Sequence, residues 1–292
     1  MIEISNLYKS YGKTKVLENI NLKFEDNKIY GLLGRNGVGK TTLLNIISNQ
    51  IKSNSGEVKL DGKEIFENSK AVSDICLVSE KGIIVDDIRV KKIFGIASIL
   101  YKNWDEDYKD KLIEEFNLDI KKKYDKLSRG NKTIVGLIIG LASRSRITIF
   151  DEPSLGLDAA HRDKFYSLLL QDVDKNPRTI IISTHLIDEV TNLFEEVIIL
   201  KDKKVFIKDK VNDLMKSAYY LNGKEEAILS IIDNKKVIHR ESFGSTVVMG
   251  IFDKLTKGEK LQLKENKVEI NPIPLQKLFI YLTENPYKRE AV

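Results

Sequence analysis

A lysine and a threonine end a glycine-rich segment whose residue types suit phosphate binding. The segment Gly34–Thr41 reads Gly-Arg-Asn-Gly-Val-Gly-Lys-Thr, and at every position it fits the phosphate-binding loop that follows a strand and opens a helix. Glycines such as Gly37 and Gly39 let the backbone fold tightly, so that its N–H groups and the helix N-terminus point at an anion. We therefore expect Lys40 to reach the β- and γ-phosphates of a nucleotide and Thr41 to bind Mg²⁺.

Two carboxylates stand at the end of an apolar segment later in the chain. Arg146–Asp151 is a run of the kind that a strand buried on both faces needs. Asp151 and Glu152 therefore lie at the carboxyl end of a strand, where open α/β sheets bind their ligands. We expect Asp151 to hold Mg²⁺ through its water shell, and Glu152 to orient the attacking water or to accept its proton.

Strands alternate with helices around these motifs. We predict strands at Ile2–Ile4, Ile20–Phe24, Lys28–Leu33, Gly56–Leu60, Ile75–Ser79, Arg146–Asp151, Thr179–Ser183 and Glu196–Leu200. We predict helices at Thr41–Asn49, Val90–Tyr101, Tyr108–Phe116, Ala160–Leu170 and Ile187–Phe194. This order favours an α/β fold with a mainly parallel sheet, and the helical period over about residues 85–145 indicates an inserted helical subdomain.

The motifs end near Lys210, and residues 212–292 predict a small α+β accessory domain. Helices are expected at Lys224–Ile232 and Pro274–Thr283, and strands at Lys236–Ser242, Ser245–Ile251 and Lys260–Leu263.

The composition limits where the chain can act. Of its 292 residues 42% are hydrophobic and 31% charged, and the net charge is +5, which fits a soluble globular protein and gives no reason to expect a nucleic-acid partner. The single cysteine, Cys76, excludes an internal disulfide and suits a reducing cytoplasm. Neither a signal peptide nor an apolar stretch near the ~20 residues of a membrane span is visible. We expect any membrane span to come from another chain.

Four motifs together resemble one family. Gly34–Thr42, the sequence LSRGN at Leu127–Asn131, IFDEPSLGLD at Ile149–Asp158 and Ser183-Thr184-His185 stand in the order of the nucleotide-binding domains of ATP-binding-cassette (ABC) transporters. The resemblance covers about residues 1–210. It implies a P-loop NTPase fold over residues 1–211, with N-terminal antiparallel strands, a mainly parallel sheet and the inserted helical subdomain.

The resemblance also implies a shared site, in which two such domains face each other head to tail with ATP and Mg²⁺ between them. The second ABC domain would belong to an identical or a different chain. Ser128 and Gly130 would cap the γ-phosphate on the partner, Asp158 would communicate across the dimer, and His185 would contact the γ-phosphate. The implied ATP contacts are Tyr11, which would stack on adenine, with Gly34, Asn36, Gly37, Gly39, Lys40, Thr41, Thr42, Ser128, Gly130 and Asp158. The implied catalytic residues are Lys40, Glu152 and His185, and the implied metal ligands are Thr41, Glu80 and Asp151.

Three positions depart from the family pattern. Arg129 stands at a glycine position of the signature LSGGQ, and Asn131 stands at its glutamine. Arg129 would add a positive charge near the partner's phosphates, face solvent, or contact the membrane subunit. Glu80 replaces a glutamine that binds Mg²⁺ and senses the membrane subunit, and Gly82–Arg89 would begin the face that docks that subunit.

These departures resemble Gram-positive exporters of bacteriocins, antibiotics and peptide toxins, whose ATPase and permease are separate chains. The terminal segment Pro274–Thr283 resembles the end of those ATPases. The resemblance thus implies an ATPase that acts at the cytoplasmic face of the membrane and powers export by a separate permease. A soluble ABC ATPase without a transporter, or a regulator, is the alternative.

Overall fold

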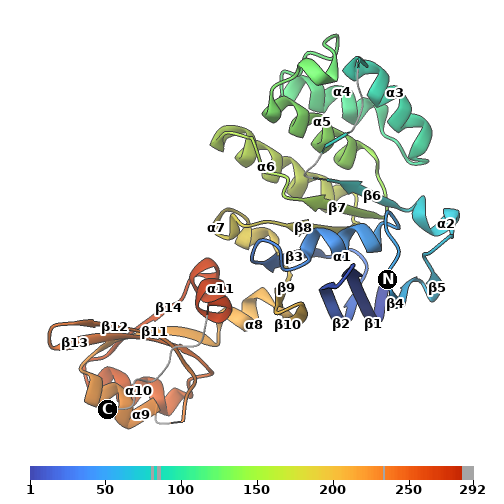
Figure 1. Ribbon diagram of the computed structural model, residues 1–292. Coiled ribbons are helices and arrows are strands. Elements are labelled where there is room, and N and C mark those ends of the chain that lie inside the picture. Colours follow the sequence, from blue (N-terminus) through green and yellow to red (C-terminus); the bar gives the residue numbers. More distant parts are fainter. Residues whose placement is uncertain (80–81, 84–86, 233, 285–292) are drawn as a thin grey trace. The chain divides into compact units, whose positions relative to one another are not determined.

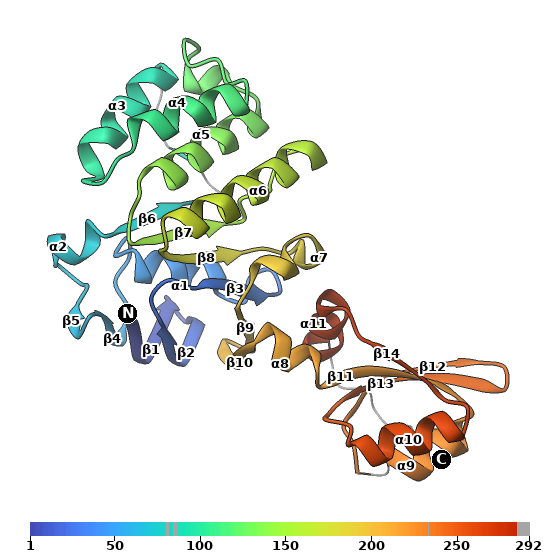
Figure 2. The ribbon, with the colours of Figure 1, turned by 180° about the vertical axis from the view of Figure 1, so that it is seen from behind.

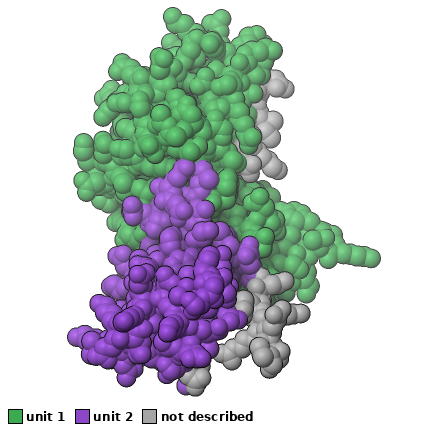
Figure 3. All heavy atoms as spheres, turned by 90° about the vertical axis from the view of Figure 1, so that its left-hand side faces the viewer, with its two compact units in different colours: residues 1–185, 193–208 green, residues 186–192, 209–292 purple. Residues whose placement is uncertain are grey.

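The computed structural model describes residues 1–79, 82–83, 87–232 and 234–284 (Figure 1). The chain divides into two compact units, which Figure 3 colours separately. The first unit comprises Met1–His185 and Leu193–Lys208, and the second comprises Leu186–Asn192 and Asp209–Val292.

A six-stranded sheet forms the centre of the first unit, in the order β10-β9-β3-β8-β7-β6. Its strands are β3 (Ile29–Gly34), β6 (Ile75–Val78), β7 (Ile147–Asp151), β8 (Thr179–Ser183), β9 (Glu196–Lys201) and β10 (Lys204–Lys210). The pairs β9–β3, β3–β8, β8–β7 and β7–β6 are all parallel. Every residue of β3, β7 and β8 is buried, as near-continuous apolar strands of a covered parallel sheet require. The predicted α/β class is confirmed.

A second sheet has the order β2-β1-β4-β5 and is antiparallel throughout. Its strands are β1 (Ile2–Tyr11), β2 (Thr14–Phe24), β4 (Ser55–Leu60) and β5 (Lys63–Glu64). Helix α1 (Lys40–Ile47) links the sheets, because Leu43, Leu44 and Ile47 are fully buried in one apolar core with residues of both. This packing fixes the first turn of α1 against β3.

Three helices form the inserted subdomain: α3 (Val90–Leu100), α4 (Glu106–Glu115) and α5 (Arg129–Ala142). They lie together beyond the β6–β7 edge of the sheet (Figure 1). Asp105 caps α4 and Ser128 caps α5 through side-chain oxygens that accept backbone N–H bonds, as helix N-termini favour. Helix α6 (Ala159–Lys175) begins in the same way at Asp158. Shorter elements before residue 194 are α2 (Ser69–Val72), a 3₁₀ turn at Tyr124–Lys126, α7 (Ile187–Val190) and a 3₁₀ turn at Thr191–Leu193.

The second unit contains the succession strand, helix, strand, strand, helix, strand, and its sheet has the antiparallel order β12-β13-β11-β14. This is the ferredoxin-like arrangement (Figure 2). Its elements are β11 (Ala218–Gly223), α9 (Glu225–Ile232), β12 (Val237–Phe243), β13 (Thr246–Phe252), α10 (Lys257–Glu265) and β14 (Glu269–Pro272), with α8 (Val211–Met215) before them and α11 (Leu275–Thr283) after them. Residues of both helices and of the sheet share one apolar core.

The strand predicted at Lys260–Leu263 is wrong, because these residues lie in α10. Thr256 and Glu259 form a capping box at the start of this helix, a signal that fixes an N-terminus regardless of the alternation that follows it. Leu263 is buried whereas Leu261 is exposed. The two leucines therefore do not share the buried face that a strand would have given them.

Candidate functional site

The motifs meet at one edge of the six-stranded sheet. Strands β3, β8 and β7 are parallel neighbours, so their carboxyl ends lie side by side, where such sheets bind ligands. The phosphate-binding loop follows β3, His185 follows β8, and Asp151 pairs in register with Ser183. Three segments that are far apart in the sequence therefore converge at this edge.

The loop after β3 depends on glycine at two positions. Gly37 and Gly39 have φ of 78° and 112°, which residues with a Cβ rarely adopt. A Cβ on Gly39 would also lie 2.7 Å from Cδ2 of Leu17 and 3.0 Å from the carbonyl oxygen of Val16. The loop thus folds tightly against β2, and α1 begins directly after Gly39.

Lys40 lies in the first turn of α1 and is only 7% exposed. Its Nζ donates a hydrogen bond of 2.6 Å to the Gly34 carbonyl and lies 4.0 Å from Oε1 of Glu152. The buried cation is therefore held between the loop and the acidic residue after β7. A buried ammonium needs such acceptors, because an unpaired one is expensive.

Glu152 has a strained backbone, with φ of 53°. Its N–H donates to the carbonyl of Ser183 at 3.0 Å, which holds this conformation in place. Non-glycine residues with positive φ cluster at functional sites, where the surrounding structure compensates for a strain of about 1–3 kcal/mol. In this conformation the Glu152 carboxylate lies 4.0 Å from Nζ of Lys40.

His185 contacts the other oxygen of the same carboxylate. Its Nδ1 lies 2.7 Å from Oε2 of Glu152. A carboxylate offers only acceptors, so Nδ1 carries the proton and donates it. This hydrogen bond orients the ring and leaves Nε2 for a ligand in the pocket.

Asp151 is buried at the end of β7, and its Oδ1 accepts a hydrogen bond from the Ser183 hydroxyl. Nowhere in the described ranges do three or more His, Cys, Asp or Glu side chains gather as a ready-made metal site. The residues nevertheless fit Mg²⁺, which is usually held by one or two protein ligands together with phosphate and water. Thr41, which lines the pocket, and Asp151 would supply those protein contacts.

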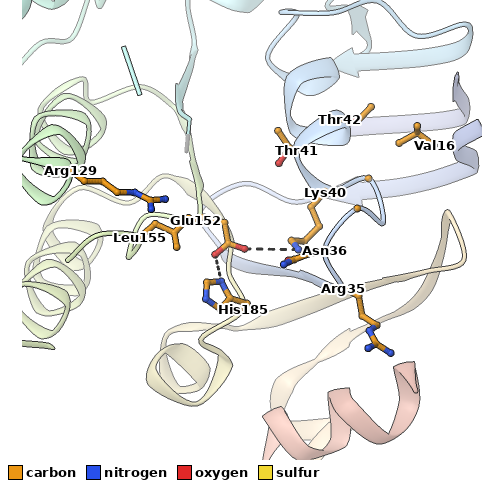
Figure 4. A pocket seen from close by; sticks show the side chains of 12 residues that line it. Val16, Arg35, Asn36, Lys40, Thr41, Thr42, Arg129, Glu152, Leu155 and His185 are labelled. Atoms are coloured by element: carbon orange, nitrogen blue, oxygen red, sulfur yellow. Dashed lines mark hydrogen bonds and ion pairs between the residues drawn. The ribbon is translucent and has the colours of Figure 1, made fainter. Parts of the chain in front are cut away.

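A pocket of about 660 Å³ contains the convergent side chains (Figure 4). Its lining is Val16, Arg35, Asn36, Gly37, Gly39, Lys40, Thr41, Thr42, Arg129, Glu152, Leu155 and His185. Three of these residues are permanent cations and one is a carboxylate, so the pocket favours an anionic ligand.

Several residues implied by the family resemblance lie outside this lining. Tyr11 ends β1 and is 52% exposed. Ser128 accepts the backbone N–H of Asn131, and Asp158 accepts both the backbone N–H and the ring Nδ1–H of His161, which lowers the pKa of its carboxyl group. Their roles at a shared site stay predictions, as does the role of Gly130. Glu80 lies outside the described residues.

Comparisons with known proteins identify the family. The family model described as ABC transporter matches residues 17–155. The ABC transporter ATP-binding protein YtrB of Bacillus subtilis is 32% identical over 193 residues, which are 66% of this chain and 66% of YtrB. The tungstate uptake system ATP-binding protein TupC of Peptoclostridium acidaminophilum is 34% identical over 200 residues, 66% of this chain and 90% of TupC. The chain belongs to the ABC transporter ATP-binding proteins.

The fold agrees with this assignment. The dimeric structure of MJ0796, a bacterial ABC transporter cassette, matches 72% of this chain and 99% of its own, with a TM-score of 0.65 and 23% identity. As an ABC ATPase subunit, the chain uses ATP with Mg²⁺. No helix in the part of the chain that the structure describes is long and apolar enough to cross a membrane.

Sequence reasoning missed four residues that line the pocket. Val16, Arg35 and Leu155 were not predicted as site residues, and Arg129 was not predicted to line the pocket of its own chain. Arg35 lies within the recognised loop and could have been included by position alone. Val16 and Leu155 carry no chemical signal, because apolar side chains near a nucleotide look like any others in the sequence. Only the tertiary contacts bring them to the pocket.

Gly130 gives a stability prediction with a matched control. A Cβ there would lie 2.7 Å from the carbonyl oxygen of Gly156, in the loop that follows Glu152. Gly130→Ala should therefore force α5 away from this loop and destabilise the first unit by about 1–3 kcal/mol. Gly95 lies exposed in α3 with open space around it, and Gly95→Ala should stabilise by up to about 1 kcal/mol. Chemical denaturation measures both, and a stabilising Gly130→Ala would contradict the tight contact.

Proposed function

We propose that the chain is the ATP-hydrolysing subunit of an exporter, and that it powers a separately encoded membrane permease. Lys40, Glu152 and His185 support the ATP-hydrolysing part of the proposal, because one pocket combines a phosphate-binding cation with an oriented general base. ATP would bind with Mg²⁺ at a head-to-tail interface with a second ABC domain. Residues 1–211 would form the nucleotide-binding domain and residues 212–292 an accessory domain.

Each side chain has a distinct task in this proposal. The loop N–H groups and Lys40 would hold the β- and γ-phosphates. Glu152 would accept the proton of the attacking water, and a positioned base of this kind contributes about 10²–10⁴-fold in rate. His185 would hold the Glu152 carboxylate through Nδ1 and present Nε2 to the γ-phosphate.

An apolar groove of about 320 Å³ supports the permease as partner. Its lining comes from β6, α3 and α5 and includes Leu77, Ile93, Ile96, Leu100 and Ile139. Ile96 and Leu100 are 42% and 65% exposed. We propose that a cytoplasmic helix of the permease occupies this groove, because an amphipathic helix buries its apolar face in such a site.

The groove gives a prediction about assembly. Ile96→Glu would place a charge in the apolar contact and should weaken association with the permease at least about tenfold, or about 1.4 kcal/mol. Ile99→Glu is the matched control, because Ile99 is exposed on α3 but does not line the groove. Binding to the detergent-solubilised permease is measured for both. Equal binding by the two variants would remove the groove as the docking site.

Export, as distinct from import, rests on the resemblance of LSRGN and the terminal segment Pro274–Thr283 to Gram-positive exporters of peptides and antimicrobials. The ATPase of a phenol-soluble-modulin exporter is the specific candidate.

TupC, a relative, is named for uptake, so the direction of transport needs its own experiment. Inverted membrane vesicles that contain the complex should accumulate a labelled amphipathic peptide when ATP is added, and vesicles with Lys40→Met should not. ATP hydrolysis without peptide accumulation would overturn the proposed substrate class, and a chain that binds no permease would favour a soluble ATPase or regulator.

A further inference from the structure

The chain passes from its first unit to its second directly after His185. The first unit includes Met1–His185, and the second unit starts with Leu186–Asn192, the segment that contains α7. All twelve residues that line the pocket of Figure 4 belong to the first unit. The second unit is therefore joined covalently to a residue of the pocket, although every lining residue comes from the first.

Helix α7 (Ile187–Val190) depends on other segments for its position. It has four residues, far fewer than the roughly 12–15 that an isolated helix needs in water. The residue before it is Leu186, whose apolar side chain cannot accept the N–H bonds left open at the start of a helix. At the other end, the Thr191 hydroxyl donates to the Ile187 carbonyl at 2.8 Å. The start of α7 therefore needs an acceptor from another segment.

Gln276 in α11 supplies an acceptor. Its Oε1 accepts the backbone N–H of Asp188 at 3.3 Å, and α7 and α11 are in contact within the second unit. Asp188 lies three residues after His185 in the sequence. The Gln276 side chain thus caps α7 from outside and holds the backbone that directly follows the histidine.

Helix α11 is itself held by the sheet of the second unit. One face of the helix is buried through Leu275, Leu278 and Leu282. Near its end, the Tyr281 hydroxyl lies 2.9 Å from the hydroxyl of Tyr220 in β11. The ring of His239 in β12 stacks on the Tyr281 ring, with their centroids 4.3 Å apart and their planes 12° apart. These contacts fix α11 on the sheet, and α11 carries Gln276.

We propose that Gln276 is a positioning residue for His185, through which the second unit affects the rate of ATP hydrolysis. The inference rests on the proposed role of His185, whose Nδ1 lies 2.7 Å from Oε2 of Glu152. While Gln276 holds α7, the backbone after His185 is fixed and the ring keeps this contact. Once the Asp188 N–H is released, the ring moves more freely and orients Glu152 less well. Small displacements of a catalytic group lower the rate of the chemical step.

The test measures ATP hydrolysis by the assembled complex over a range of Mg²⁺–ATP concentrations. Gln276→Met keeps the length of the side chain and removes the acceptor. It should lower kcat about two- to fivefold, as loss of one hydrogen bond does. KM for ATP should stay unchanged, because the loop Gly34–Thr41 remains intact. Gln276→Glu retains an acceptor oxygen and should restore most of kcat. Lys277→Met is the matched control on the same helix, because Lys277 is exposed.

A second measurement follows His185 directly. The chain has three histidines, and ¹³C labelling of their rings gives a signal for His185, identified by its absence from His185→Ala. This signal should shift in Gln276→Met and return toward its original position in Gln276→Glu. An unshifted signal, or an unchanged kcat of Gln276→Met, would overturn the inference alone. An unchanged kcat of His185→Ala would overturn the proposed function of His185 as well.

Discussion

Replacing Glu152 with glutamine is expected to slow ATP hydrolysis about 10²–10⁴-fold while ATP stays bound. The amide keeps the size of the side chain and an acceptor for Nδ1 of His185, which now lies 2.7 Å from Oε2. It cannot take a proton from water at neutral pH. The chemical step should therefore fail after the nucleotide has been positioned, and the ATP-bound dimer should accumulate.

Phosphate release by the assembled complex measures the rate, and size-exclusion chromatography with ATP measures the dimer. Glu57→Gln is the control, because Glu57 lies exposed on β4 and does not line the pocket. A Glu152→Gln variant that hydrolyses ATP at the unchanged rate would show that another group activates the water. A variant that is inactive but never dimerises with ATP would argue against a site shared between two subunits.

The chemistry of the site could be predicted from sequence because its residues belong to contiguous motifs. The spacing of glycines, lysine and threonine in Gly34–Thr41 is sufficient to identify the phosphate-binding loop. No residue from a distant part of the chain is needed to recognise it. Asp151 and Glu152 were predictable for a similar reason, since a fully apolar strand must end at the ligand-binding edge of a parallel sheet. Local sequence therefore sufficed wherever one segment supplied both the geometry and the chemistry.

The position of Arg129 could not be predicted in this way. Its sequence context left open whether it met a partner's phosphates, solvent or the membrane subunit. The structure brings it to its own pocket because Gly156 lacks a side chain and Gly130 allows α5 to approach the loop. Gly130 and Gly156 allow two segments about 26 residues apart in the sequence to approach each other closely. A local sequence pattern does not describe such a contact.

In the second unit, sequence patterns predicted a helix but missed two strands. The helix at Lys224–Ile232 was predictable from its apolar period, whereas β11 and β14 were missed. Strand β14 is a four-residue edge strand that is mostly exposed, so alternation has too few residues to be visible. Such a strand is specified mainly by pairing with β11, which is tertiary information.

Replacing Lys40 with methionine is expected to abolish useful ATP binding. The Nζ cation is buried, donates to the Gly34 carbonyl at 2.6 Å and lies 4.0 Å from the Glu152 carboxylate. Removing one partner of a buried charge contact costs about 2–5 kcal/mol. The dissociation constant for ATP should therefore rise roughly 30- to more than 1,000-fold. Titration of the monomer with Mg²⁺–ATP measures the change.

The expected loss is large because Lys40 also lies 4.0 Å from the Glu152 carboxylate. Its charge offsets the buried Glu152 carboxylate, so methionine removes the attraction for phosphate and leaves the repulsion from Glu152 unopposed. Lys40→Met combined with Glu152→Gln should therefore recover part of the lost affinity, whereas the exposed Lys63→Met should not change it. If the double variant bound ATP no better than Lys40→Met, the carboxylate would not be opposing the phosphates, and the lysine would act on the nucleotide alone.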